Sequence, residues 1–356
     1  MPRTRSRDRV ERSPHLVSGG SYAFLVAGLG VALVAATAFA IGVGTVAVPV
    51  DQVLAVISGH LSGDTGGLDP LVDQIVWDFR TPRVLLAAVA GAGLSLAGLC
   101  LQTLVRNPLA DPYVFGVSAG ASLGAVIALT AGAGAVAAVG VAGSAFVGSL
   151  LSLLLVFAMA QRGGRLLGSS LVLAGVALAY LGNALTGYIQ LQADPSELRG
   201  VMFWLLGSVA GASWSSLTVP FAATAVTAAV LATRLRPMNA LATGDDTAAG
   251  LGVDVNRLRV LLLVASSLLT AAVVSSAGGI GFVGLIVPHA VRLVVGPDHR
   301  RVLPVSLLSG AVFLVLVDLV TRTVERPNEM PVGIVTAVLG APFFLVLLRG
   351  RKRVPR

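Results

Sequence analysis

The stretch from residue 112 to residue 161 contains no Asp, Glu, Lys or Arg. A helix crosses the hydrocarbon core of a membrane with roughly 20 apolar residues, so this stretch is too long for one crossing. It predicts two membrane spans with a turn between them. The segment AGAGA at 131–135 is where glycine favours that turn.

The rest of the chain has the same character. Of its 356 residues, 55% are hydrophobic and only 12% are charged, too few to cover the surface of a water-soluble protein. The long uncharged runs predict an all-α, polytopic membrane protein with about ten transmembrane helices. The expected spans are residues 22–46, 84–105, 113–131, 135–160, 168–192, 212–233, 257–277, 280–295, 302–320 and 331–348.

Positively charged residues set the expected orientation. An even number of spans puts both termini on one side, and if that side is the cytoplasm, 20 of the 25 Lys and Arg residues lie inside. We therefore expect a basic cytoplasmic tail at 1–21, a transmembrane domain at 22–349 and a second cytoplasmic tail at 350–356, in the cytoplasmic (inner) membrane of a bacterium. The basic residues expected outside are Arg80, Arg83, Arg199, Arg322 and Arg326.

Two other interpretations of the basic charge and of the first apolar run are nucleic-acid binding and a cleaved signal peptide, and neither is expected. The net charge of +8 follows from the expected topology, and without a basic soluble domain nucleic-acid binding is not expected. The first apolar run resembles a signal peptide, but its length of about 25 residues exceeds the usual hydrophobic region of such peptides. We expect this run to be retained as the first span.

Two glycine motifs match enzyme signatures only in form. Gly116–Gly120 fits the nucleophile-elbow pattern, which needs a strand-to-helix turn that an apolar membrane helix does not provide. The spacing of Gly116, Gly120 and Gly124 favours close helix packing instead. Gly279–Gly284 fits a dinucleotide-binding pattern, but outside a βαβ unit it indicates a helix break.

Nucleotide and metal sites are not expected in this chain. Its single lysine, Lys352, excludes a GxxxxGK[ST] phosphate-binding loop, so any ATP that powers it is hydrolysed by another chain. The four histidines lack metal-ligand spacing, and the single Cys100 excludes a multi-cysteine site. We therefore expect no enzyme activity, no metal and no cofactor here.

Asp318 is the clearest ionisable residue within an expected span, where a charge is costly. Arg322 follows one helical turn later, which favours an ion pair, with a proton-relay role as the alternative. An ion-driven secondary transporter would need intramembrane carboxylates or a broken helix. Asp318 and the helix break near Gly278 and Gly279 are the features that support a secondary transporter.

Three segments in which proline, glycine and charged residues interrupt the apolar runs carry a specific resemblance. They are Arg80–Arg83 followed by Gln102–Pro112, then Gly281–Arg300, then Asn328–Phe343. In this order and with ten spans, the chain from about residue 22 onward resembles the permease subunits of the iron-siderophore, haem and vitamin B12 class of ABC importers.

The resemblance implies a non-catalytic, ten-helix subunit that dimerises with an identical or related permease. It also implies an inverted repeat of spans two to five and seven to ten. An ABC ATPase dimer would hold ATP and Mg²⁺, and an extracytoplasmic binding protein would deliver the cargo. The expected cargo is a ferric siderophore, with haem and vitamin B12 as alternatives carried by the same mechanism.

The loop at about 238–256 is expected to couple this chain to the ATPase. In it Asp245 is expected to cap a short helix at 246–251 that stops at Gly252, and Asp254 to cap the next span. The resemblance implies that a coupling helix here enters a groove of the ATPase; the alternative is a solvated loop. The expected coupling residues are Gly244, Asp245, Asp246, Ala248, Ala249, Gly250, Leu251 and Gly252.

The resemblance also assigns roles outside and within the membrane. Arg80, Arg83 and Arg322, with Arg326 as an alternative to Arg322, would dock glutamates of the binding protein. Anchoring to lipid phosphate is the competing interpretation of these arginines. Asn183, Thr186 and Gln190, on nearly one face of span five, are candidates for lining the pathway, or they bond to neighbouring helices.

Overall fold

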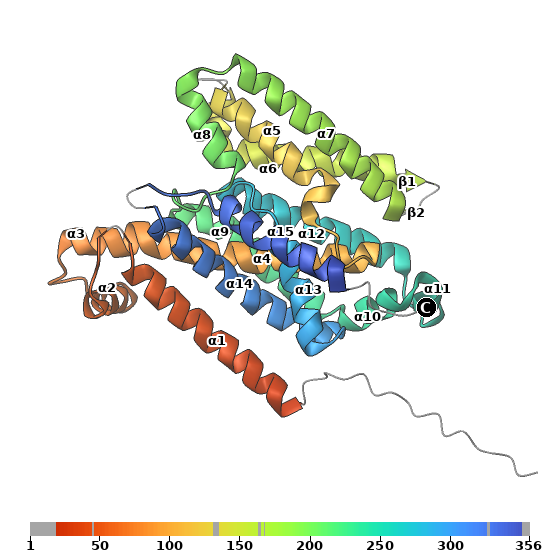
Figure 1. Ribbon diagram of the computed structural model, residues 1–356, viewed down its shortest axis with the longest axis horizontal. Coiled ribbons are helices and arrows are strands. Elements are labelled where there is room, and N and C mark those ends of the chain that lie inside the picture. Colours follow the sequence, from red (N-terminus) through yellow and green to blue (C-terminus); the bar gives the residue numbers. More distant parts are fainter. Residues whose placement is uncertain are drawn as a thin grey trace, which may run out of the picture.

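The computed structural model describes residues 19–44, 46–130, 135–162, 165–166, 168–325 and 328–350. Over these ranges the chain is a bundle of long helices with shorter helices at its two ends (Figure 1). Most of the two expected tails, and Arg326, lie outside the described residues.

Ten apolar helices account for the ten expected spans. Seven described stretches are long and apolar enough to cross a membrane by length and composition, and shorter apolar stretches in α5, α13 and α15 complete the set. The predicted all-α membrane fold is confirmed. The ten are α1 (Gly19–Gly42), α4 (Thr81–Val105), α5 (Val117–Thr130), α6 (Ala135–Ala160), α7 (Gly168–Gln192), α9 (Trp214–Ala232), α12 (Val255–Ala277), α13 (Val283–Val295), α14 (His299–Thr323) and α15 (Val332–Gly350).

The second span is longer than its prediction. α3 (Pro70–Asp73) and the π-helix η1 (Gln74–Arg80) run directly into α4, so one helical segment extends from Pro70 to Val105. Pro82 lies just after the π-helical turn, where the change of helix type accommodates its missing N–H. The segment ends at Val105, before Pro108 and Pro112, as those prolines predict.

Shorter elements gather at both ends of the bundle (Figure 1). We call one the α2–α3 end; it carries α2 (Val50–Ser62), α3 and α8 (Pro195–Leu205). The short helix η2 (Pro112–Phe115) lies inside the bundle, where Pro112 is next to Gly284 of α13. We call the second end the α10–α11 end; it carries α10 (Leu235–Thr243) and α11 (Asp245–Gly250). The strands β1 (Gln161–Arg162) and β2 (Arg165–Leu166) pair antiparallel at this end, with Gln161 opposite Leu166.

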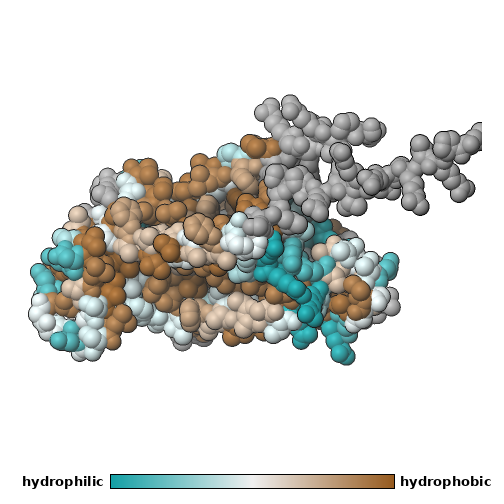
Figure 2. All heavy atoms as spheres, turned by 90° about the horizontal axis from the view of Figure 1, so that it is seen from below, coloured by the Kyte–Doolittle hydropathy of each residue, from teal (hydrophilic) through white to brown (hydrophobic). Residues whose placement is uncertain are grey.

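The surface reflects the expected membrane environment. Seen from below, hydrophobic side chains cover much of the middle of the molecule, and hydrophilic ones gather toward its two ends (Figure 2). Large apolar side chains such as Phe24, Leu173 and Val226 are more than half exposed. Such exposure is expected where lipid replaces water as the solvent.

α4 is the central helix, and small residues let its neighbours approach. It packs against α14, α12, α9 and α13. A Cβ added to Gly91 would lie 2.1 Å from the carbonyl oxygen of Gly310 on α14. One added to Gly98 would lie 1.9 Å from that of Gly284 on α13. These helices therefore touch backbone to backbone, which only glycine permits.

α4 and α12 run antiparallel, as an inverted repeat that begins with these two helices requires. Gly93 of α4 lies against Val273 of α12. One turn later, the carbonyl of Ala97 accepts a hydrogen bond of 3.1 Å from the hydroxyl of Ser266, which precedes Val273. Along this contact the residue numbers of α4 increase while those of α12 decrease.

The glycines at four-residue spacing pack as predicted. A Cβ at Gly120 would lie 2.4 Å from the carbonyl oxygen of Gly148 on α6, and one at Gly124 would lie 2.1 Å from that of Ser144. Ser118 of the nucleophile-elbow pattern is buried in α5. α5 ends at Thr130 and α6 begins at Ala135, which places the predicted break; residues 131–134 lie outside the described ranges.

The dinucleotide-like glycine pattern is a helix break, as predicted. α12 ends at Ala277, and Gly278 turns the chain with a φ of 68°. A Cβ there would lie 2.2 Å from the carbonyl oxygen of Trp204 at the end of α8. Both the positive φ and the close approach require glycine at this position.

Candidate functional site

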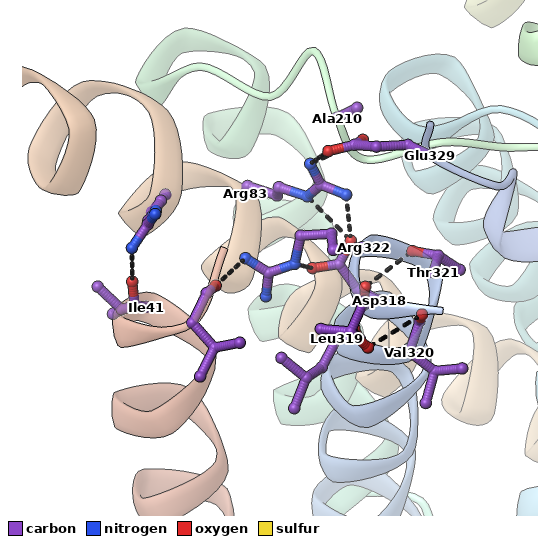
Figure 3. Close-up of polar contacts among 12 residues, drawn as sticks. Ile41, Arg83, Ala210, Asp318, Leu319, Val320, Thr321, Arg322 and Glu329 are labelled. Atoms are coloured by element: carbon purple, nitrogen blue, oxygen red, sulfur yellow. Dashed lines mark hydrogen bonds and ion pairs between the residues drawn. The ribbon is translucent and has the colours of Figure 1, made fainter. Parts of the chain in front are cut away.

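Arg83 lies at the start of α4, between two carboxylates from distant parts of the chain (Figure 3). Its Nε donates to Oδ1 of Asp318 on α14 at 2.9 Å. Its Nη1 donates to both carboxylate oxygens of Glu329, at 2.9 and 3.0 Å. Asp318 is fully buried and Glu329 is partly exposed. Arg83 therefore ties the beginning of α4 to the end of α14 and to the segment that precedes α15.

Arg322 shares the same buried aspartate. Its Nε lies 3.2 Å from Oδ2 of Asp318, which confirms the predicted ion pair (Figure 3). Its Nη1 donates to the carbonyl of Val43 at 3.2 Å. Its Nη2 is buried without a hydrogen-bond partner among the described residues. The side chain is thus held by one carboxylate and retains capacity to donate.

Arg80 makes no ion pair with a described residue. Its Nη1 donates to the carbonyls of Ile41 and Gly42, at 3.0 and 2.9 Å, and its Nη2 to the carbonyl of Val46. The first two carbonyls belong to the last residues of α1 and the third follows the helix. Backbone acceptors at a helix C-terminus lack intrahelical partners. Arg80 therefore caps the end of the first span, a role that its sequence position does not reveal.

The three arginines line one small cavity at the α2–α3 end, of about 200 Å³. Glu329 and Phe79 also line it. With Asp318 behind it, the site holds three guanidinium groups and two carboxylates, a formal charge of +1. All three arginines are at least nine-tenths buried, so a partner can reach them only by inserting a small group into the cavity. Their predicted docking role stays a prediction.

The predicted coupling segment forms a short helix at the opposite end of the bundle. α11 begins after Gly244, whose φ of 137° only glycine adopts readily, and Gly252 has a φ of 78° after the helix ends. The expected cap by Asp254 is confirmed, because its side chain accepts from the backbone N–H of Arg257 at 3.0 Å.

The expected cap by Asp245 is wrong. Gly244 occupies the cap position, and Asp245 is the first residue of α11. Its carboxylate instead accepts two bonds from Nη2 of Arg259 on α12, at 3.0 and 2.8 Å, and lies 3.8 Å from Nη1 of Arg106. A charged partner on the next helix outcompetes a local backbone N–H. Asp245 therefore fastens α11 to α12.

The exposed side of α11 carries small, mostly uncharged side chains. Ala248 is fully buried against this chain, while Leu251 is 70% exposed. Asp246, Ala249 and Gly250 are exposed as well. Any partner at this end therefore contacts a surface of small side chains from which Leu251 projects.

The three pathway candidates on α7 differ in environment. Asn183 is exposed, Gln190 is half-buried, and Thr186 is buried, its hydroxyl without a hydrogen-bond partner among the described residues. The structure therefore leaves Asn183 as the most accessible of the three in one copy of the chain. A pathway role for them stays a prediction.

Two buried polar networks escaped the sequence analysis. In the first, Pro288 of α13 has no N–H to donate to the carbonyl of Gly284. Nε2 of Gln102 on α4 donates to that carbonyl and to that of Leu285, each at 3.1 Å. Its Oε1 accepts from Arg292. A glutamine followed by a distant proline is too common a pattern to reveal such a link.

The second network joins α10, α4 and α14. The Oδ1 of Asn239 accepts from the backbone N–H of His299 at 2.9 Å, and the two imidazole nitrogens of His299 lie 2.6 Å from Asn239 and 2.8 Å from Thr103. Nδ2 of Asn239 donates to Asp298 at 2.7 Å. Burial raises the pKa of the Asp298 carboxyl, but hydrogen bonds from the Arg300 backbone and Asn239 outweigh it and hold this pKa below its ordinary value.

Comparisons with known proteins identify the family. The model of the FecCD transport family matches residues 32–350. The chain is 44% identical over 332 residues to the cobalamin import system permease protein of Halobacterium salinarum, covering 90% of this chain and 89% of that protein. It is 40% identical over 288 residues to the hemin transport system permease protein of Yersinia pestis, covering 78% and 84%.

A solved structure agrees with the sequence matches. A metal-chelate type ABC transporter in an inward-facing conformation superposes with a TM-score of 0.80 at 32% identity, covering 92% of this chain and all of that one. Fold, family model and relatives thus agree over nearly the whole length. The chain belongs to the FecCD transport family, the permeases of ABC importers.

Proposed function

We propose that this chain is a permease subunit that is moved by a separate ATPase dimer and supplied by a separate binding protein. The observation that carries this proposal is the position of the two predicted contact sites at opposite ends of one helix bundle (Figure 1). α4 and α14 connect these ends through Arg83 with Asp318 at one and Thr103 with His299 at the other. A displacement at the ATPase side can therefore reach the delivery side through packed helices.

The distribution of charge supports an orientation. The α10–α11 end carries arginines such as Arg234, Arg257 and Arg300, and positive residues favour the cytoplasm. The α2–α3 end carries exposed aspartates such as Asp51 and Asp64. The α10–α11 end is therefore cytoplasmic in this proposal, both termini lie on that side, and the host membrane is the cytoplasmic (inner) membrane.

The arginine-lined cavity would receive a carboxylate of the binding protein. Three guanidinium groups face two carboxylates there, and Nη2 of Arg322 is unpartnered among the described residues. One further carboxylate would neutralise the site and use that donor. Because the arginines are recessed, this contact selects a protruding acidic side chain, such as glutamate on a loop.

The ATPase would dock on α11 and its flanking residues. Leu251 projects from a surface of small residues, and a partner groove would bury it. Asp245, bonded to Arg259, would pass the resulting displacement to α12. ATP and Mg²⁺ would be bound by the ATPase, and this chain would form no covalent bond during transport.

The cargo would be a metal chelate. The relatives are named for cobalamin and hemin import, and the solved neighbour for metal chelates. A ferric siderophore, the expected cargo, belongs to the same chemical class. A second permease subunit, identical or related, would complete a pathway of the width that such molecules need.

Ion-coupled transport is the weaker alternative. It would rest on Asp318, and the buried Asp318 carboxylate lies between the guanidinium groups of Arg83 and Arg322. Oδ1 pairs with Arg83 and Oδ2 with Arg322, so both carboxylate oxygens are engaged within the protein. The structure therefore favours a structural role for this residue.

The test is reconstitution of the chain with its ATPase and its cognate binding protein in proteoliposomes. The expected result is ATP hydrolysis stimulated by loaded binding protein, and uptake that depends on ATP. Ferric siderophore, hemin and cobalamin, offered separately, assign the cargo. Uptake that follows an imposed ion gradient without ATP would overturn the proposal.

A further inference from the structure

A second polar cavity, of about 600 Å³, lies at the α10–α11 end, and the function proposed above assigns no role to its arginines. Its walls come from the beginning of α10, the residues after α11 and the first two turns of α12. Arg234, Arg236 and Arg257 line it, together with Asp254. Leu258 and Leu261 supply an apolar wall.

The charge of this cavity is unbalanced. Asp254 is already engaged, because one oxygen caps α12 and the other lies 3.0 Å from Nε of Arg257. The side chains of Arg234 and Arg236 are exposed, and no described residue forms an ion pair or a hydrogen bond with either of them. Three arginines against one aspartate leave a formal charge of +2, with two guanidinium groups free to bind an anion.

An apolar stripe leads from the cavity along α12. Leu261, Val264 and Leu268 follow Arg257 at spacings of four, three and four residues, which places them on one helical face. All three are at least partly exposed, and Leu268 is 38% exposed. The stripe extends from the guanidinium groups toward the middle of a membrane-crossing helix.

The cavity also lies at the depth where lipid headgroups are found. Arg234 follows the end of α9 by two residues, and Arg257 is in the first turn of α12. Both helices are long and apolar enough to cross a membrane. Arginines at the ends of such helices, next to apolar side chains, meet phosphate and acyl chain together.

We propose that this cavity binds an anionic phospholipid, with its phosphate between Arg234, Arg236 and Arg257 and an acyl chain along Leu261, Val264 and Leu268. A free phosphate ion would use the arginines but not the apolar stripe. A soluble protein partner would not reach the stripe, which runs into the bilayer. The combination of the two features selects a lipid.

The site touches the segment assigned to ATPase coupling, since Leu251 and Gly252 form part of its wall. A bound lipid would hold the exit of α11 against α12. Lipid binding itself requires neither the ATPase nor the binding protein, so it can be tested on this chain alone and fails or succeeds independently of the proposed function.

The test is native mass spectrometry of the full-length chain, released from detergent with phosphatidylglycerol or phosphatidylcholine titrated in. Phosphatidylglycerol should bind at least tenfold more tightly. Each neutralised arginine should weaken its binding about fivefold, so R234Q/R236Q should lose about 25-fold. R300Q is the matched control, because Arg300 is exposed at the same end outside the cavity, and it should bind as the parent does.

Two further variants make the outcome decisive. R234K/R236K should retain most of the binding, which separates lost charge from a folding defect. L261Q should weaken phosphatidylglycerol binding, because the acyl chain loses an apolar contact, but should leave the binding of inorganic phosphate itself unchanged. Equal binding of the two lipids, an unchanged R234Q/R236Q, or displacement of the lipid by millimolar inorganic phosphate would each overturn the proposal.

Discussion

Nε of Arg83 donates to Oδ1 of Asp318 at 2.9 Å, and this bond joins residues 235 positions apart in the chain. It fixes the start of α4 against the end of α14, next to the cavity that three arginines line. Since Arg322 shares the same carboxylate, one buried aspartate balances much of the positive charge at the α2–α3 end.

Asp318→Asn should therefore destabilise the protein strongly. The substitution keeps the shape of the side chain but removes the ion-pair partner of the buried Arg322, and loss of one buried partner costs about 3–5 kcal/mol. Thermal unfolding in detergent measures the effect. The control is Asp73→Asn: Asp73 pairs with His60 at the same end, but both side chains are partly exposed, so this change should cost less than Asp318→Asn. Equal melting temperatures for both variants would contradict the structural role of Asp318.

Glu329→Gln should strengthen docking of the binding protein. The change raises the formal charge of the arginine-lined cavity from +1 to +2 and replaces the ion pair of Arg83 Nη1 by a weaker bond to an amide oxygen, which an incoming carboxylate can displace. Association should become a few-fold faster at low salt, with a smaller gain at high salt. Surface plasmon resonance on the reconstituted permease measures the rate. A slower association would show that docking does not use this cavity.

Leu251→Asp should detach the ATPase while the permease remains inserted. Leu251 is 70% exposed on the surface assigned to the ATPase, and a charge there would be buried without a partner. Co-purification of the ATPase measures the loss. The matched control is Leu61→Asp, because Leu61 is 79% exposed at the opposite end. If both variants retain the ATPase equally, α11 is not the contact.

Gly98→Ala should separate α4 from α13. The new Cβ would lie 1.9 Å from the carbonyl oxygen of Gly284, so the helices must move apart, at about 1–3 kcal/mol for overpacking. Gly28→Ala is the control, since a Cβ there meets nothing within 4 Å. Thermal unfolding compares the two, and a stable Gly98→Ala variant would refute the close backbone contact.

Gln102→Leu should cost about 1–3 kcal/mol, because the carbonyl of Gly284 then loses the donor that replaces the missing N–H of Pro288. Adding Pro288→Ala restores a backbone N–H donor for this carbonyl, so part of the lost stability should be regained. A double-mutant cycle on unfolding temperatures measures this coupling. Additive effects would mean that Gln102 acts mainly through Arg292.

The sequence by itself determined the ten spans, their breaks and the local ion pair of Asp318 with Arg322. In hydrocarbon each backbone polar group must be satisfied within its own helix, so the length and punctuation of apolar runs are enough to define the helices. An i, i+4 pair on one helix is likewise fixed by helical geometry alone.

Only the tertiary structure decided which distant side chains meet. Asp245 bonds Arg259 instead of capping α11, Glu329 bonds Arg83, and Gln102 serves the carbonyl that Pro288 leaves free. Each of these contacts depends on which helix faces lie together. Packing between uniformly apolar helices is set by small residues and close backbone approach, which leave little periodic signal in a sequence.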